Sequence, residues 1–209
     1  TNVTLQILPT GSNPDSNPYL LTLERDEVEL EQQAASSYIE TINNAQGSYS
    51  IGVIKVPSFY QDFTARRRGD KDYRSTTLDV EKIVENLVEI GIDAITIDLR
   101  GNSGGLLDEA ASLTGLFINE GPLVQLKDTN EKIDVINDPI PGSIYDGPMV
   151  VLIDRFSASA SEIFAGAIQD YSRGIIIGQK TYGKGSVQSL YPLDRYSRFT
   201  SKKGFGQLT

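Results

Sequence analysis

MVVLIDRFSASASEIFAGAIQDYSRGIIIG, residues 149–178, is the stretch that says most about the fold of this chain. It opens with the apolar run 149–153, which is typical of a strand buried on both faces. Apolar side chains then recur with helical spacing, which predicts a helix over 159–171. A second apolar run, 174–178, follows. A strand, a helix and a strand in this order predict a parallel β-α-β unit.

The same alternation between apolar runs and helical spacing is found toward the N-terminus. Further strands are predicted at 51–56 and 93–99, helices at 77–90 and 106–118, and a hairpin at 122–126 and 132–136. Together these segments predict an α/β core with a largely parallel sheet. N-terminal to this core, apolar and polar side chains alternate in residues 3–8 and 19–30, which predicts two strands. Two strands are too few to make a domain. The polar stretch 31–47 is interpreted as a connector.

Composition excludes several kinds of function. The net charge of −9 argues against nucleic acid as a partner, and no run of 18 apolar residues is present to span a membrane. The chain has no histidine and no cysteine. A Ser-His-Asp triad, a cysteine nucleophile, a histidine zinc site and a disulfide are therefore impossible. A nucleophilic enzyme with this composition needs lysine or a carboxylate as its base.

Three predicted strands run into loops that carry polar or glycine residues, at 101–105, 157–162 and 178–185. Sites in parallel α/β sheets gather beyond the carboxyl ends of the strands. We therefore expect these three loops to form one site.

Ser159 has two interpretations. With Glu162 it matches the capping box that begins many helices, which gives it a purely structural role. Alternatively, its hydroxyl is a nucleophile at a helix start, where the amide of Ala160 can help to hold an oxyanion. A second oxyanion donor would come from Gly104 or Gly105 in the glycine-rich loop.

Lys184 lies between two glycines and can enter a tight, dry position. It must be uncharged to act as a base, and desolvation favours that form. If residues 184–188 are extended, Gln188 shares its face and can orient the amine. The alternative is an exposed lysine in a turn.

Two other motifs each have two interpretations. Residues 178–185 match a phosphate-binding loop except at its eighth position, which is Gly185, and no helix is predicted to follow. The basic loop 57–74 is either an anion or partner site or a solvated loop diluted by Asp70 and Asp72. No calcium loop is complete.

Four segments resemble the carboxyl-terminal processing proteases, peptidase family S41, and especially the tail-specific branch of Gram-negative bacteria. They are Asp98-Leu-Arg-Gly-Asn-Ser-Gly-Gly105, Gly115-Leu-Phe-Ile-Asn119, 156–170 and 178–188. The resemblance implies that Ser159 is the nucleophile, Lys184 the general base and Gln188 its orienting partner. It places the oxyanion hole at Ala160 and a glycine of the 101–105 loop. It gives Asp170 a supporting role at the far end of the helix.

The resemblance also implies a fold and a setting. The fold is a spiral core like those of crotonases and caseinolytic proteases, preceded by β-strands of a truncated PDZ domain. We expect a PDZ remnant at 1–30, a connector at 31–47 and a catalytic core at 48–209 that is truncated at its C-terminus. The chain begins at Thr1 without a signal peptide, so we expect a mature form or a fragment of a periplasmic protein.

The expected activity is cleavage of proteins recognised by free, apolar C-terminal tails, with an adaptor protein as a further possible partner and without a metal or organic cofactor. Two alternatives remain open. One is a catalytically incomplete fragment of the same fold that only binds peptides. The other is a crotonase-like acyl-thioester enzyme, which needs oxyanion amides but no Ser-Lys pair.

Overall fold

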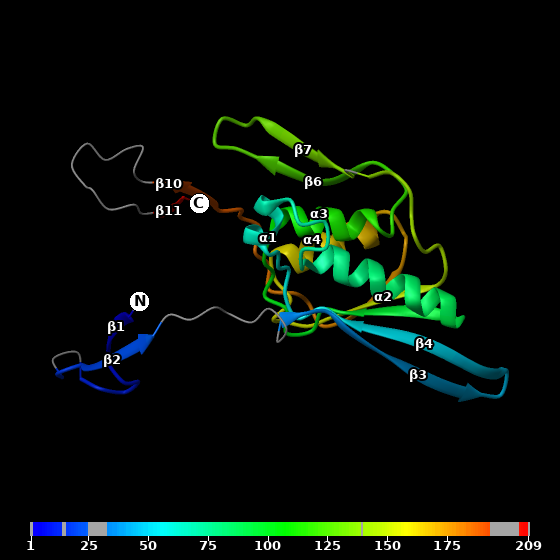
Figure 1. The fold of residues 1–209 in the computed structure, drawn as a ribbon, viewed down its shortest axis with the longest axis horizontal. Helices are drawn as coiled ribbons and strands as arrows, with labels where there is room; N and C mark the ends of the chain where they lie inside the picture. The colour runs from blue at the N-terminus through cyan, green and yellow to red at the C-terminus, as the bar shows by residue number, and fades with distance from the viewer. Residues whose placement is uncertain (1, 14–15, 25–32, 139, 193–204, 209) are drawn as a thin grey trace. The chain divides into compact units, whose positions relative to one another are not determined.

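The computed structural model describes residues 2–13, 16–24, 33–138, 140–192 and 205–208 (Figure 1). The chain divides into two compact units, Thr1–Gln32 and Gln33–Thr209. The first unit is an antiparallel hairpin of β1 (Asn2–Ile7) and β2 (Tyr19–Glu24). This hairpin confirms the two strands expected from the alternating pattern at the start of the chain.

The second unit is built on a five-stranded sheet. Its order is β3 (Ser36–Asn44), β4 (Gly47–Lys55), β5 (Ala94–Asp98), β8 (Met149–Ile153) and β9 (Ile175–Gly178). The last four strands are parallel, and only the edge strand β3 is antiparallel to its neighbour. The prediction of an α/β core with a largely parallel sheet is confirmed.

Part of the stretch interpreted as a polar connector, 31–47, forms a strand instead. β3 pairs with β4 along its whole length, with Tyr38 opposite Val53 and Ile42 opposite Tyr49. All nine residues of β3 are exposed. A strand at the edge of a sheet tolerates polar side chains, so its composition resembles that of a loop. The interpretation as a connector is therefore wrong for Ser36–Asn44.

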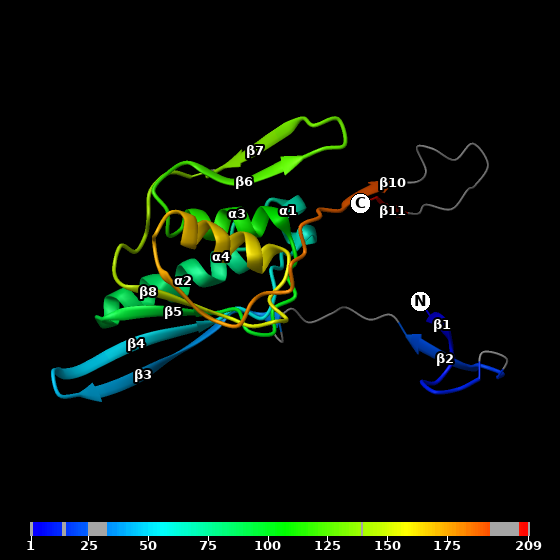
Figure 2. The ribbon, with the colours of Figure 1, turned by 180° about the vertical axis from the view of Figure 1, so that it is seen from behind.

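Three helices lie on one side of this sheet: α2 (Thr76–Ile90) and α4 (Ala160–Asp170) contact its strands, and α3 (Leu107–Gly115) packs on these two helices (Figures 1 and 2). α2 begins at Ser75, whose hydroxyl accepts a hydrogen bond from the Leu78 N–H (3.2 Å), and ends at Gly91 with φ of +87°. Only glycine adopts such a φ without strain, which is why the helix ends there. In the described part of the chain, no helix has the length and apolar character needed to cross a membrane.

The remaining elements are short. The expected hairpin is confirmed as β6 (Pro122–Lys127) and β7 (Ile133–Asn137), and β10 (Ser189–Pro192) pairs with β11 (Phe205–Leu208). The basic loop 57–74 contains one helix that we did not expect, α1 (Phe63–Arg68). Its six residues are too few to show a helical period, and it is held by a cap in which Asp62 accepts from two backbone amides.

The core lies between the sheet and the three helices. Ile54, Ile97 and Val151 stand side by side on neighbouring strands, and each is fully buried. Above them, Phe164 of α4 meets Phe117 edge to face, with ring centroids 6.1 Å apart. This packing fixes α4, and with it the residues at the start of α4, against the ends of the strands.

Replacing Phe164 with alanine removes a fully buried ring, and we expect the free energy of unfolding to fall by about 3–5 kcal/mol. Chemical denaturation measures this change. The matched control is Phe63→Ala, because Phe63 is 50% exposed and its loss should change stability far less. Equal effects of the two substitutions would contradict this description of the core.

Candidate active site

The three loops predicted to share a site do meet. A cavity of about 180 Å³ lies beyond the carboxyl ends of β5, β8 and β9, and its walls come from all three loops: Gly105, Leu106, Leu107, Ser159, Ala160, Ile163, Lys184, Ser186, Val187 and Gln188. Five of the six predicted site residues therefore line one cavity. Gly104, the sixth, lies against it, because a Cβ placed there would approach the Cβ of Ser159 to 2.8 Å.

The three serines of the segment 157–161 have different environments, which the sequence alone does not show. Ser157 and Ser161 are fully buried, and their hydroxyls donate to the carbonyl oxygens of Leu99 and Asn102 (2.9 Å each). Only Ser159 is half-buried and faces the cavity. The two outer serines therefore fasten the segment to the loop after β5, and the middle one is presented to the site.

The backbone at Ser159 is strained. Its φ is +57° and its ψ is −113°, in a region that side-chain-bearing residues rarely occupy. Such conformations cost about 1–3 kcal/mol and persist where the surrounding structure holds them. The sharp turn between β8 and α4 is thus maintained at the residue that faces the cavity.

Glu162 connects the serine segment to the lysine segment. The Glu162 carboxylate accepts from the Ser159 N–H (2.8 Å), which is the half of the predicted capping box that the acid makes, whereas the Ser159 hydroxyl makes no cap hydrogen bond. The same carboxylate accepts from the N–H groups of Gly183 (2.7 Å) and Lys184 (2.9 Å) and from the hydroxyl of Thr181. The cap interpretation is therefore confirmed for Glu162, whose carboxylate does more than begin a helix.

These bonds also set the charge of Glu162. Burial by itself would raise its pKa, but the hydrogen bonds from Thr181 and from the three backbone amides outweigh burial and bring the pKa below its ordinary value. The carboxylate is therefore ionised at neutral pH and is fully occupied as an acceptor.

Two residues that line the cavity, Ala160 and Gly105, have backbone N–H groups without an acceptor among the described residues. Ala160 is the first residue of α4, so its N–H has no acceptor within the helix. Among the described residues, none accepts a hydrogen bond from Ala160 or Gly105. Gly104 differs, because its N–H donates to Oδ1 of Asn102 (2.8 Å). Of the two glycines expected as alternative oxyanion donors, Gly105 has an N–H without an acceptor among the described residues, whereas the Gly104 N–H is already engaged.

Lys184 and Gln188 enter the cavity from the segment after β9. Residues 179–188 form no regular secondary structure, yet Lys184, Ser186 and Gln188 all line the cavity, as alternate positions of an extended chain would. Lys184 is half-buried and Gln188 is exposed. The Tyr182 N–H donates to the Ser157 carbonyl (3.0 Å), which holds this segment beside the serines.

Two further expectations from the sequence can be compared with the structure. Asp170 ends α4 at the opposite end from Ser159, as expected, and its side chain is exposed. The chain after Gly185 continues into β10, so the helix that a phosphate-binding loop needs does not follow it.

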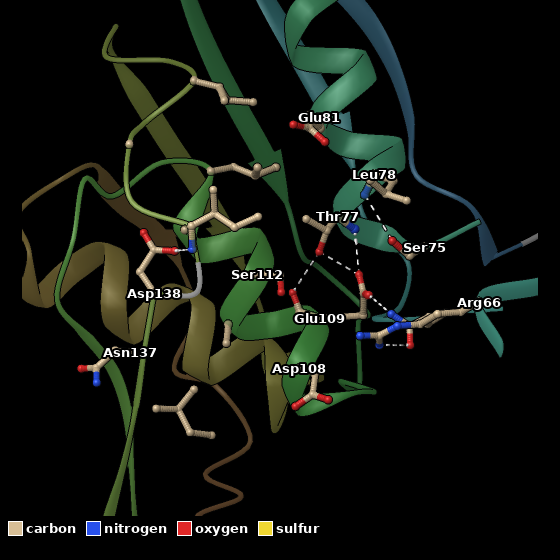
Figure 3. Close-up of a pocket in the computed structure, with 18 of the residues that line it drawn as sticks. Arg66, Ser75, Thr77, Leu78, Glu81, Asp108, Glu109, Ser112, Asn137 and Asp138 are labelled. Carbon is tan, nitrogen blue, oxygen red and sulfur yellow. Dashed lines mark hydrogen bonds between the residues drawn. The ribbon is translucent and has the colours of Figure 1, made fainter. Parts of the chain in front are cut away.

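The basic loop borders a larger pocket, shown in Figure 3. There the buried carboxylate of Glu109 accepts from Thr77 Oγ1 (2.8 Å) and Gln61 Nε2 (2.7 Å), and Arg66 donates to Gln61 (2.7 Å). Arg68 pairs with Asp70, and Arg74 pairs with Asp79. These contacts fasten α1 and α2 to α3, which agrees better with the structural interpretation of this loop than with an anion site.

Sequence reasoning missed Asn102 and Asp154. Asp154 Oδ1 accepts from the N–H groups of Gly101 (3.1 Å), Phe156 (2.9 Å) and Ser157 (3.1 Å), so it joins the loops after β5 and β8. Asn and Asp are common in turns whatever their role. Their positions after predicted strands were the only available signal.

The pH dependence of the Glu162 contacts can be tested. Because the folded pKa of Glu162 is depressed, its contribution to stability is complete above the ordinary value of 4.5 and is lost as pH falls through the lower folded value. We expect Glu162→Gln to be less stable than the wild type at pH 7, with the difference shrinking below pH 4.5. Denaturant titrations over a pH series measure this difference, and Glu81→Gln on α2 is the control. A difference that stays constant with pH would contradict the assignment.

Comparisons with known proteins agree with this geometry. The model of the family "Peptidase family S41" matches residues 50–204. The tail-specific protease of Haemophilus influenzae is 42% identical over 93% of this chain, and a chloroplastic carboxyl-terminal-processing peptidase 2 of Arabidopsis thaliana is 31% identical over 89%. The chain spans only 26% and 33% of those two proteins.

A solved structure with a similar fold also comes from this family of proteases. A photosystem II D1 C-terminal processing protease superposes with a TM-score of 0.64 and 26% identity, covering 93% of this chain and 47% of its own. The sequence match and the fold agree, and the resemblance seen in the four sequence segments is confirmed. This chain belongs to peptidase family S41.

Proposed function

We propose that the second unit is the catalytic core of a serine endopeptidase in which Ser159 is the nucleophile and Lys184 the general base. One observation carries this proposal: the only half-buried serine of the 157–161 segment shares a cavity of about 180 Å³ with Lys184, Gln188 and two unengaged backbone amides. Family membership supports the same reaction class, because the relatives are named as proteases.

The reaction starts with transfer of the Ser159 hydroxyl proton to the uncharged amine of Lys184 as Oγ attacks the peptide carbonyl. The oxyanion that forms is held by the N–H groups of Ala160 and Gly105. The tetrahedral intermediate collapses when Lys184 returns the proton to the leaving amine, which leaves an acyl-enzyme on Ser159. Water then hydrolyses this ester by the same steps. Gln188 orients the amine throughout.

Glu162 is unsuited to be the base, although it lies closest in sequence to the nucleophile. Its carboxylate already accepts from three backbone amides and the Thr181 hydroxyl. These bonds lower its pKa, which makes it a weak proton acceptor. Its role in this proposal is to hold the other participants in place.

The substrates in this proposal are proteins with apolar C-terminal tails. The names of the relatives from Haemophilus influenzae and Arabidopsis thaliana refer to tails and carboxyl termini. The cavity walls support the apolar preference, because Leu106, Leu107, Ile163 and Val187 surround the reacting groups.

The domain assignment belongs to the same proposal. We interpret the β1–β2 hairpin as the closing strands of a PDZ domain, and Gln33–Thr209 as part of a spiral core of the crotonase and caseinolytic-protease type. A periplasmic location and an adaptor protein follow from the likeness to the tail-specific proteases.

The test is hydrolysis of a peptide with an apolar C-terminal tail by the complete gene product that carries these residues. We expect Ser159→Ala and Lys184→Ala each to lower kcat by more than about 1000-fold, because the two side chains act as one unit. A fluorophosphonate probe should label the wild type and should not label Ser159→Ala.

Ser112→Ala and Lys82→Ala are the matched controls, because both residues lie on other helices and outside the cavity. They should retain wild-type hydrolysis. Full hydrolysis by either site variant would refute the protease mechanism. Thioester turnover without peptide cleavage would indicate a crotonase-like enzyme instead, and tail binding without turnover would indicate a peptide-binding module.

A further inference from the structure

Asn102 is a fully buried polar residue at the centre of the glycine-rich loop. Both the nitrogen and the oxygen of its side-chain amide form hydrogen bonds. Nδ2 donates to the carbonyl oxygen of Val56 (2.7 Å), just beyond the end of β4, and Oδ1 accepts from the N–H of Gly104 (2.8 Å). The side chain thus ties the glycines of its own loop to the neighbouring strand.

The backbone of Asn102 extends this connection to the serine segment. Its carbonyl oxygen accepts from the Ala158 N–H (3.0 Å) and from the Ser161 hydroxyl (2.9 Å). Its own N–H donates to the Leu99 carbonyl (3.1 Å). A single residue is therefore bonded to the segments that follow β4, β5 and β8.

The direction of the Gly105 N–H follows from the bond made by the carbonyl of the same peptide unit. In a trans peptide, the C=O and N–H groups point to opposite sides of the chain. The Gly104 carbonyl accepts from the Phe59 N–H (3.1 Å), so the Gly105 N–H of the same peptide unit points away from Phe59. Gly105 also lines the cavity that contains Ser159, which leads us to infer that its N–H faces that cavity.

Gly104 does not by itself fix the orientation of the peptide unit that it shares with Gly105. Its φ is +104°, and glycine rotates easily. Two bonds hold Gly104 on either side of its Cα: its carbonyl oxygen, in the peptide unit that it shares with Gly105, accepts from the Phe59 N–H, and its own N–H, in the preceding peptide unit, donates to Asn102 Oδ1. Asn102 is the only side chain among the described residues that bonds to this glycine backbone.

We propose that Asn102 is a positioning residue that aims the Gly105 N–H at the oxyanion. This proposal rests on the proposed function of Ser159, and it adds a residue that touches neither the substrate nor the nucleophile. An amide is required here, because one side chain must donate at Nδ2 and accept at Oδ1. Aspartate keeps the acceptor but faces the Val56 carbonyl without a donor.

The experiment compares Asn102→Asp and Asn102→Ala with the wild type, in the complete gene product that carries these residues. We expect kcat to fall by about 10²–10³-fold, the loss typical of one missing oxyanion donor, while KM changes less than about threefold. Affinity for a peptide aldehyde, whose adduct carries the oxyanion, should fall in parallel with kcat/KM. Affinity for the uncleaved peptide, measured in a Ser159→Ala background, should not change.

Thr114→Val is the control for loss of a buried hydrogen bond. Thr114 is fully buried in α3 and donates to the Ala110 carbonyl (2.6 Å), with no contact to the glycine loop. It should lower Tm and leave kcat unchanged. Ser161→Ala is a gentler variant if the Asn102 variants do not fold, because it removes only the hydroxyl that holds the Asn102 carbonyl. It should lower kcat severalfold at constant KM.

The outcomes separate the two proposals. Wild-type kcat and aldehyde affinity in a folded Asn102 variant, or in Ser161→Ala if the Asn102 variants do not fold, would overturn the positioning role. A fall in Tm without a change in kcat, as expected for Thr114→Val, would overturn it as well. Hydrolysis that survives Ser159→Ala would instead refute the proposed function itself, whatever Asn102 does.

Discussion

The Glu162 carboxylate makes the interaction on which the rest of this site depends. Its oxygens accept from the backbone N–H groups of Ser159, Gly183 and Lys184, so one side chain holds two segments that are more than twenty residues apart. Hydrogen bonds to an ionised carboxylate are stronger than neutral ones. Because these bonds reach main-chain atoms, they fix where the chain runs and leave the side chains of Ser159 and Lys184 free to face the cavity.

The parallel sheet makes this link possible. β5, β8 and β9 end at the same edge, and each is followed by a loop that contributes to one cavity. The loops are then joined to one another by polar groups: Asn102 and Asp154 connect the first two, and the Tyr182 N–H joins the third to Ser157. This dense bonding stabilises the unusual φ of Ser159, which an isolated turn would not maintain.

The elements that sequence reasoning found are those with a strong period or a long apolar run. The parallel strands and α2 and α4 fall where the pattern placed them, because burial on a sheet or beneath a helix leaves a regular signal. β3 was missed because its residues are exposed, and α1 because it is only six residues long. Ser159, Lys184 and Gln188 were proposed from motif and resemblance. The choice between Gly104 and Gly105 was beyond the sequence, because it depends on the direction of a peptide plane.

The arrangement around Lys184 also answers a chemical requirement of the proposed mechanism. A carboxylate beside an amine favours the charged amine, which cannot act as a base. The nearest carboxylate in the network, Glu162, bonds to the Lys184 main chain, and its oxygens are taken up by four donors. Among the described residues, Lys184 has no ion pair, unlike Lys82 or Lys132. In the proposed mechanism, Glu162 therefore positions Lys184 through its backbone N–H and forms no ion pair with its amine.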